Sequence, residues 1–312
     1  MTSAPLSRRA PVEPRTTHAG IAGIGIYRPP ASVPDSERLT GADCLGVSYR
    51  VQAKSGLNTA SLAAGAARAA LKASGIDPST LELIVAGTTT PDVLWPATAC
   101  LVQSELGLPM VGSFDLYAAQ ASLLTAFHVA AKYMSSGARG ALVIGAETSN
   151  QLLDFPGQSG GRRARGASAV VLAAGDGGGE ILATAAGGRA SSEGSRGALN
   201  GTAAAGFSGA VADCLRRGDL SLGEIDLVIA EQTAPDLMRS WLRESGVSTG
   251  SFLLDPERYA DTFAAAPFAV LHDAVKEDRL KEGQTALMLS YGSGPVWAVA
   301  CLRWGKGGVS EW

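Results

Sequence analysis

The sequence has few cysteines and no long hydrophobic run. Its four cysteines lie far apart and form no CxxC pair: Cys44, Cys100, Cys214 and Cys301. This spacing supports neither a zinc site nor a redox motif, and we expect small buried thiols in a reducing compartment. No apolar run approaches the length of about 18 residues that a membrane span needs. Residues 1–18 lack the apolar stretch of a secretory signal, so we expect a mobile tail and a cytoplasmic protein without a metal site.

Charge of one sign is not in excess either. The chain has 26 Lys and Arg against 29 Asp and Glu, a net charge of −3. Nucleic-acid binding requires clustered basic residues in surplus, so nucleic acid is not an expected partner. Apolar residues make up 46% of the 312 residues, which excludes disorder. A chain of this length can form one large domain or two closely joined halves.

Short apolar runs rich in β-branched residues alternate with longer, alanine-rich helical patterns. Strands are predicted at 20–27, 81–87, 112–116, 141–145, 168–173, 180–185, 225–230, 251–254, 285–290 and 296–303. Helices are predicted at 59–74, 96–106, 120–136, 235–245 and 262–278. Strands that are apolar throughout and are separated by helices indicate an α/β fold whose sheets are covered on both faces.

An internal repeat divides the chain. Residues 81–92 align with residues 225–236 at an offset of 144, with five of twelve positions identical. A period of this length indicates a duplicated domain rather than a solenoid. We therefore predict two similar α/β halves, at 19–176 and 207–312, which follow the tail at 1–18. Between the halves, residues 177–206 are rich in Gly, Ala and Ser, which favours a flexible loop as the junction.

Several motifs occur in order along both halves. Thr-Thr-Thr-Pro-Asp at 88–92 is followed by Pro-Ala-Thr-Ala-Cys at 96–100, Asp-x-x-Ala-Ala at 115–119 and Gly-x-Gly-x-x-Trp at 292–297. With these motifs the chain, from about residue 20 to residue 304, resembles the thiolase superfamily and within it β-ketoacyl-acyl-carrier-protein synthase III (KAS III). The resemblance implies a duplicated five-layer αβαβα fold, a dimer, no cofactor, and an acyl carrier protein or acyl-CoA thioester as partner.

The three catalytic positions of that family carry other residues here. The resemblance places the family's nucleophilic Cys at Gln120, its His at Glu231 and its Asn at Asp261. An amide cannot attack a thioester as a thiolate does, so no acyl-enzyme is expected at Gln120. Carboxylates at the other two positions would repel the negative charge that hydrogen-bond donors normally stabilise on the thioester oxygen. A conventional Claisen condensation is therefore not expected.

Further residues complete the predicted site. Oxyanion or substrate-binding roles are predicted for Trp95, Ser122, Gly292, Ser293 and Gly294. Ser122 lies two residues after Gln120 on the same helix. Trp95 stands where the resemblance places an aromatic residue that reaches across the dimer into the partner's acyl pocket, although packing within the dimer interface would explain it equally. The segment that helps hold coenzyme A in the family is shortened here to residues 44–50, which leaves coenzyme A binding open.

Two functions fit these substitutions. We favour a non-condensing subunit that pairs with a Cys-bearing homologue in fatty-acid, polyketide or specialised-metabolite biosynthesis. The alternative is a stand-alone acyl-thioester acyltransferase, cyclase or hydrolase. In that case Glu231 and Asp261 would share a pocket, where burial and like charge raise one pKa, so that one carboxyl acts as acid and the other as base. Both readings leave open whether the dimer is formed by one chain or two.

Overall fold

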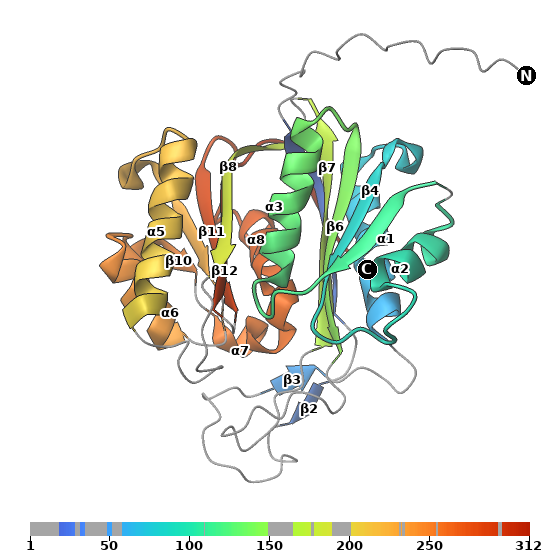
Figure 1. The fold of residues 1–312 in the computed structure, drawn as a ribbon, viewed down its shortest axis with the longest axis horizontal. Coiled ribbons are helices and arrows are strands. Elements are labelled where there is room, and N and C mark those ends of the chain that lie inside the picture. The colour runs from blue at the N-terminus through green and yellow to red at the C-terminus, as the bar shows by residue number, and fades with distance from the viewer. Residues whose placement is uncertain are drawn as a thin grey trace, which may run out of the picture.

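The computed structural model describes residues 19–28, 32–34, 49–51, 58–108, 110–148, 165–175, 178–188, 201–230, 232, 235–253, 255–292 and 295–312. The predicted tail and Cys44 lie outside these residues. A two-stranded ribbon, β2 (Ser32–Pro34) with β3 (Tyr49–Val51), lies apart from the main body in Figure 1. No helix among the described residues is both long enough and apolar enough to cross a membrane.

The first half of the chain forms a sheet with helices on both faces. Its elements follow in the order β1 (Ala19–Tyr27), α1 (Thr59–Ser74), β4 (Leu83–Gly87), α2 (Thr98–Leu106), β5 (Gly112–Leu116), α3 (Ser122–Ser135), β6 (Gly140–Thr148) and β7 (Arg165–Ala174). A short 3-10 helix, η2 (Pro78–Thr80), precedes β4. The strands lie in the order β1-β7-β6-β4-β5, with β4 parallel to both of its neighbours.

The second half repeats this plan. Its elements are β8 (Gly179–Gly188), α5 (Gly201–Arg217), η3 (Leu222–Glu224), β9 (Leu227–Ala230), α6 (Pro235–Glu244), η4 (Thr249–Ser251), β10 (Phe252–Leu253), α7 (Pro256–Tyr259), η5 (Ala260–Ala265), α8 (Ala266–Lys276), β11 (Thr285–Gly292) and β12 (Val296–Arg303). The strand order β8-β12-β11-β9-β10 matches that of the first half, with β9 in the place of β4. The repeat found in the sequence therefore corresponds to a structural repeat. The strands β1 and β8 join the halves through two residue pairs, and a last strand, β13 (Gly308–Glu311), pairs with β1.

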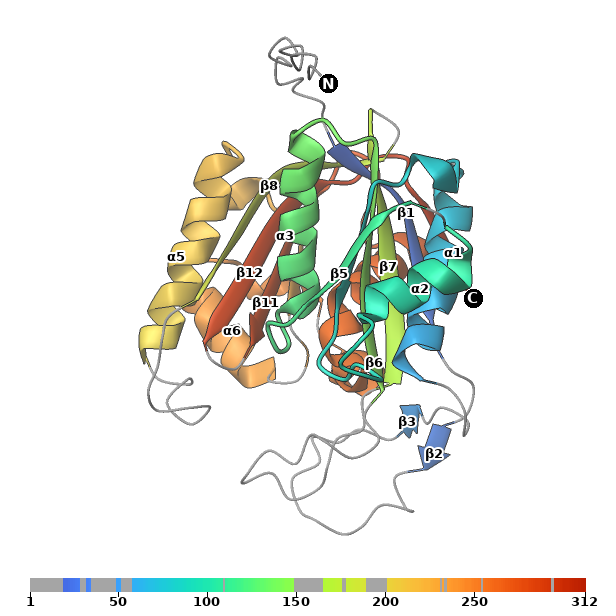
Figure 2. The same cartoon turned by 45° about the vertical axis from the view of Figure 1, so that its right-hand side comes forward.

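Three hydrophobic clusters separate the layers. One lies between the first sheet and α1 and α2, a second lies between the second sheet and α5 and α6, and the largest surrounds α3 and α8 between the sheets. In this middle layer the rings of Phe127 and Phe268 meet edge to face, with centroids 5.5 Å apart. Figures 1 and 2 show the resulting arrangement, with α3 between two sheets that carry helices on their outer faces. The predicted five-layer α/β fold is confirmed.

Close packing of the outer layer depends on small residues. A Cβ atom at Gly25 of β1 would lie 2.1 Å from the backbone nitrogen of Ala70. The helix α1 can therefore approach β1 this closely only because the residues where they meet are glycine and alanine. The helix itself begins at an Asn58 capping box and ends at Gly75, whose φ of 64° is the left-handed conformation that glycine tolerates. The two caps thus set the bounds of α1.

Three local predictions need correction. The junction at 177–206 is not a loop throughout, because β8 and the first turns of α5 lie within it; their small residues pack against strands and helices instead of forming turns. The helix predicted at 262–278 is divided into η5 and α8, with Pro267 in the first turn of α8. The helix predicted from residue 120 begins at Ser122, because a tight turn precedes it.

Candidate functional site

The chain turns sharply where β5 leads into α3, and Gln120 sits on this turn. Ala119 has a φ of 49°, an uncommon backbone conformation for a residue with a Cβ atom. The backbone N–H of Ala121 donates to the carbonyl of Ala118 at 3.0 Å, and that of Ser122 donates to Ala119 at 3.0 Å. Such strained turns are often found at functional sites. We call residues 118–121 the elbow.

The hydroxyl of Ser122 holds the elbow together. It donates to the carbonyl oxygen of Ala119 at 2.6 Å and accepts from the backbone N–H of Ala118 at 2.8 Å. The side chain is fully buried. This geometry gives the hydroxyl a role in shaping the turn, and the oxyanion or substrate-binding role predicted for Ser122 stays a prediction.

Glycines at the ends of two strands let the elbow lie between the halves. A Cβ atom at Gly292, the last residue of β11, would lie 2.4 Å from the carbonyl oxygen of Ala118. One at Gly87, the last residue of β4, would lie 2.6 Å from the carbonyl carbon of Ser122. The structure therefore brings Gly292 of the second half against the elbow of the first. Ser293 and Gly294 lie outside the described residues.

The segment that carries Asp261 lies beside the start of α3. A Cβ atom at Gly145 of β6 would lie 2.8 Å from the Cδ2 atom of Leu123 and 3.1 Å from the Cα atom of Ala265. The hydroxyl of Ser168 on β7 donates to the carbonyl of Ala265 at 2.7 Å. The backbone of η5 and the start of α3 thus meet over one glycine, although the side chain of Asp261 lies outside the described atoms.

A buried amide fixes the backbone on either side of Glu231. Glu231 itself is not among the described residues, but Gln232 is fully buried. Its Nε2 donates to the carbonyls of Ala230 at 2.6 Å and Leu253 at 3.1 Å, and its Oε1 accepts from the N–H of Asp255 at 2.9 Å. Gln232 therefore ties the end of β9 to the end of β10. Its place directly after Glu231 in the matched motif was the signal that could have identified it.

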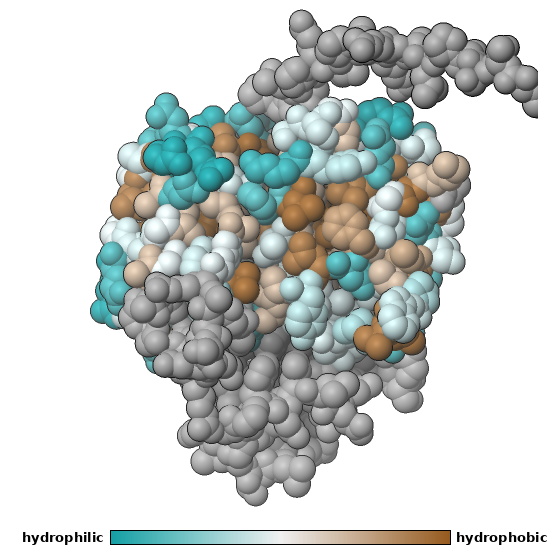
Figure 3. All heavy atoms as spheres, viewed as in Figure 1, coloured by the Kyte–Doolittle hydropathy of each residue, from teal (hydrophilic) through white to brown (hydrophobic). Residues whose placement is uncertain are grey.

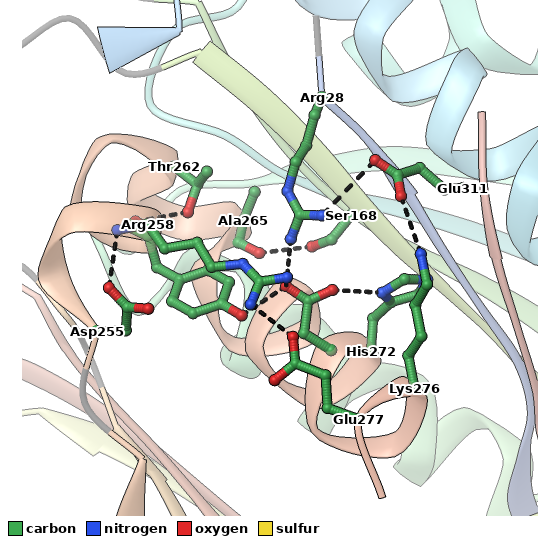
Figure 4. A network of polar contacts seen from close by, with 12 residues as sticks. Arg28, Ser168, Asp255, Arg258, Thr262, Ala265, His272, Lys276, Glu277 and Glu311 are labelled. Atoms are coloured by element: carbon green, nitrogen blue, oxygen red, sulfur yellow. Dashed lines mark hydrogen bonds and ion pairs between the residues drawn. The ribbon is translucent and has the colours of Figure 1, made fainter. Parts of the chain in front are cut away.

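Asp273 of α8 forms the centre of a charged network with Arg28, Arg258 and His272, all three of which are labelled in Figure 4. Its carboxylate is 1% exposed and lies 2.5 Å from Arg28, 2.7 Å from Arg258 and 2.5 Å from the hydroxyl of Tyr259. His272 Nδ1 lies 2.8 Å from the other carboxylate oxygen. Burial alone would raise the pKa of Asp273, but the hydrogen bonds from His272 and Tyr259 and the charge of Arg28 hold it well below its ordinary value. No local pattern in the sequence indicates this network.

Glu147, near the end of β6, is a second buried carboxyl, and no motif in the sequence predicts it. Its Oε1 accepts from the backbone N–H of Thr89 at 2.9 Å, and its Oε2 accepts from the hydroxyls of Thr89 at 2.7 Å and Thr90 at 2.9 Å. The side chain is fully buried. Burial raises the pKa of Glu147 to about 7, against the opposing effect of these hydrogen bonds.

Large apolar side chains are exposed around β5. They are Val93, Leu94, Trp95, Met110, Phe114 and Tyr117, and we call them the β5 face. Trp95 is 85% exposed and Met110 is 94% exposed. On its other side β5 pairs with β4, and no described strand covers this edge. Among the described residues no group of three His, Cys, Asp or Glu side chains could hold a metal ion.

Comparison with known proteins identifies the class to which this fold and site belong. The model of the 3-oxoacyl-[acyl-carrier-protein] synthase III family matches residues 114–190, and the model of its C-terminal region matches residues 215–304. The chain is 31% identical over 327 aligned positions to a β-ketoacyl-[acyl-carrier-protein] synthase III of Paramagnetospirillum magneticum, which covers 91% of this chain and 98% of that protein. The chain belongs to the β-ketoacyl-[acyl-carrier-protein] synthase III family.

Solved structures agree with this assignment. The Aquifex aeolicus synthase III matches with a TM-score of 0.78 at 26% identity, over 92% of this chain and all of that one. A Xanthomonas campestris OleA structure with bound lauric acid and lauroyl-CoA matches with a TM-score of 0.80 over 93% of this chain and 100% of that one. At 19% sequence identity, this match is evidence for a shared fold alone.

Proposed function

We propose that this chain is a non-condensing KAS III-like subunit that pairs with a Cys-bearing homologue and helps it to handle acyl thioesters. The observation that carries the proposal is Gln120 on the elbow. The tight turn at Ala119, the hydrogen bonds of the Ser122 hydroxyl and the close packing of Gly292 would support a reactive group at the start of a helix. An amide there cannot form an acyl-enzyme, because its nitrogen lone pair is delocalised and not nucleophilic.

The β5 face supports the pairing. Figure 3 shows apolar groups gathered in the middle of the face that carries α3 and β5. Monomeric proteins rarely expose a large contiguous apolar patch, and an unpaired strand edge invites pairing with another chain. The one carboxylate of β5, that of Asp115, accepts from the backbone N–H groups of Thr98 and Ala99 at 2.6 and 2.8 Å, so it caps α2 instead of protecting the edge. A homologous chain with the same fold is the occupant that fits both features.

The names of the relatives support the proposed substrate class. The relatives are named β-ketoacyl- or 3-oxoacyl-[acyl-carrier-protein] synthase III. The OleA structure contains lauric acid and lauroyl-CoA. We therefore propose acyl thioesters of acyl carrier protein or coenzyme A as the molecules handled by the pair. The predicted role of Trp95 belongs to this proposal, whereas the predicted acid–base roles of Glu231 and Asp261 belong to the alternative, a stand-alone acyl-thioester enzyme.

Intact-protein mass spectrometry tests the chemistry. The purified chain is incubated with acyl-carrier and acyl-CoA thioesters while free thiol release is followed. We expect no acyl adduct on the peptide that contains Gln120 and no thiol release above that of the Gln120→Ala variant. The Gln120→Cys variant should self-acylate slowly at best, because Glu231 is a poor electrostatic partner for the reaction.

Co-expression tests the pairing. The chain is produced alone and together with a Cys-bearing KAS III homologue from the same genome, and light scattering measures the masses. A mixed dimer supports the proposal. A stable acyl adduct at Gln120 overturns it, as does thioester turnover by the chain alone that is lost in Asp261→Asn, since that result favours the stand-alone enzyme.

A further inference from the structure

The last eight residues of the given sequence lie beyond the matched family region. The C-terminal family model ends at residue 304, and β13 follows it. This strand runs parallel to β1, with Gly23 opposite Gly308 and Ile26 opposite Glu311. The backbone N–H of Trp312 then donates to the carbonyl of Ile26 at 3.0 Å. Residues 308–312 are thus held along the end of β1.

Side chains strengthen this attachment on two sides. The guanidinium of Arg68 on α1 lies over the ring of Trp312, 5.6 Å from its centroid. The ammonium of Lys276 on α8 lies 3.5 Å from the carboxylate of Glu311. The C-terminal residues therefore touch β1, α1 and α8, which belong to both halves of the fold.

Arg28 connects this C-terminal strand to the network below the candidate site. It directly follows β1, and its Nη1 lies 3.6 Å from Glu311 while its Nη2 lies 2.5 Å from the buried carboxylate of Asp273 (Figure 4). Because Arg28 is only partly exposed, at 26%, its charge is screened less than that of a fully solvated side chain. One guanidinium thus bridges a carboxylate of β13 and a carboxylate of α8.

Two other partners of Asp273 lie directly before η5. Arg258 and Tyr259, from α7, both contact the carboxylate oxygen that Arg28 contacts. The hydroxyl of Thr262 donates to the carbonyl of Tyr259 at 2.7 Å, which carries this anchoring into η5. Removing a cation from a buried carboxylate leaves it poorly compensated, so each of these contacts depends on the others.

We propose that the C-terminal segment 305–312 is a positioning element of the candidate site. It holds Arg28 through β13 and Glu311, Arg28 holds Asp273, and Asp273 holds the 256–265 segment that carries Asp261. The proposal does not depend on whether the chain condenses thioesters or pairs with a homologue.

Hydrogen–deuterium exchange of the full chain tests this path. We expect the peptide that covers residues 256–265 to exchange about tenfold faster in two variants. Arg28→Met removes the charged hydrogen bond to Asp273, and a chain that ends at Trp304 loses the strand and the ion pair that hold Arg28. Glu311→Gln should give about a twofold to fivefold increase, since that ion pair is more exposed. Circular dichroism confirms that each variant is folded.

Matched variants separate positioning from general destabilisation. Arg279→Met and Glu282→Gln remove the same charges from exposed positions and should leave exchange at 256–265 unchanged. Adding Glu311→Gln to Arg28→Met should produce no further increase at 256–265, because the path runs through Arg28. The proposal fails if 256–265 exchanges at the wild-type rate in the shortened chain, if the two substitutions act additively there, or if all peptides exchange faster to the same degree.

Discussion

Loss of the proton from the buried Glu147 carboxyl should make the stability of this protein fall as the pH rises. Its pKa is about 7 in the folded chain and 4.5 in a free side chain. A carboxyl whose pKa is raised by folding contributes stability that is full below its unfolded pKa and is lost as the pH rises through its folded pKa. From these two values the free energy of unfolding should fall by about 2.5 kcal/mol between about pH 5 and about pH 8.

The Glu147→Gln variant removes the titration and keeps the shape. Its amide oxygen can still accept from the N–H of Thr89, and its amide N–H₂ can donate to the hydroxyls of Thr89 and Thr90, since hydroxyls accept as well as donate. We expect this variant to be less sensitive to pH than the wild-type chain, so that the difference in stability between the two changes by about 2.5 kcal/mol over the same interval.

Urea denaturation at a series of pH values measures this difference. The exposed Glu282→Gln variant serves as the control and should follow the wild-type profile. Parallel profiles for the wild type and Glu147→Gln between pH 5 and 8 would refute the reasoning, because they would mean that Glu147 titrates alike in the folded and unfolded chains.

Three further outcomes follow from the elbow and the β5 face. Trp95→Ala should weaken dimerisation by about 2 kcal/mol, measured by light scattering across a dilution series, while Lys281→Ala should have no effect. Ser122→Ala should lower the free energy of unfolding in urea by about 1–2 kcal/mol, because the N–H of Ala118 loses its acceptor; a loss no larger than that of the exposed Ser136→Ala would contradict this. Gly292→Ala should lower the free energy of unfolding by about 1–3 kcal/mol, because its Cβ atom would clash with the backbone of the elbow. Unchanged stability would show that the elbow can shift without cost.

The local pattern of apolar residues was sufficient to predict most of the strands. In β4 the side chains of Leu83 and Val85 join the cluster between the sheets, while Ile84 and Ala86 join the outer cluster. Both faces of the strand are therefore buried, and the sequence must be apolar throughout, which is what makes such a strand recognisable. The repeat could be recognised for the same reason, since β4 and β9 occupy equivalent places.

Other elements depend on their surroundings. The segment of β13, Gly-Val-Ser-Glu, has no alternation that marks a strand. It becomes one because β8 pairs only with Gly20 and Ile21 of β1, which leaves the rest of that edge to β13. The small residues of α5 are compatible with a loop, but the hydrophobic face that Phe207 and Val211 form against the second sheet favours a helix. In each case the deciding contacts come from residues far away in the chain.

By itself the sequence determined the fold family, the duplication and the substitution at position 120, because motifs and strand patterns are local. Only the tertiary structure decided how the site is supported. It brings Gly292 against the elbow, places η5 beside α3 over Gly145, and surrounds Asp273 with partners from three separate segments. It also raises the pKa of Glu147 to about 7. Burial and long-range contacts set these properties, and neither is encoded in the spacing of neighbouring residues.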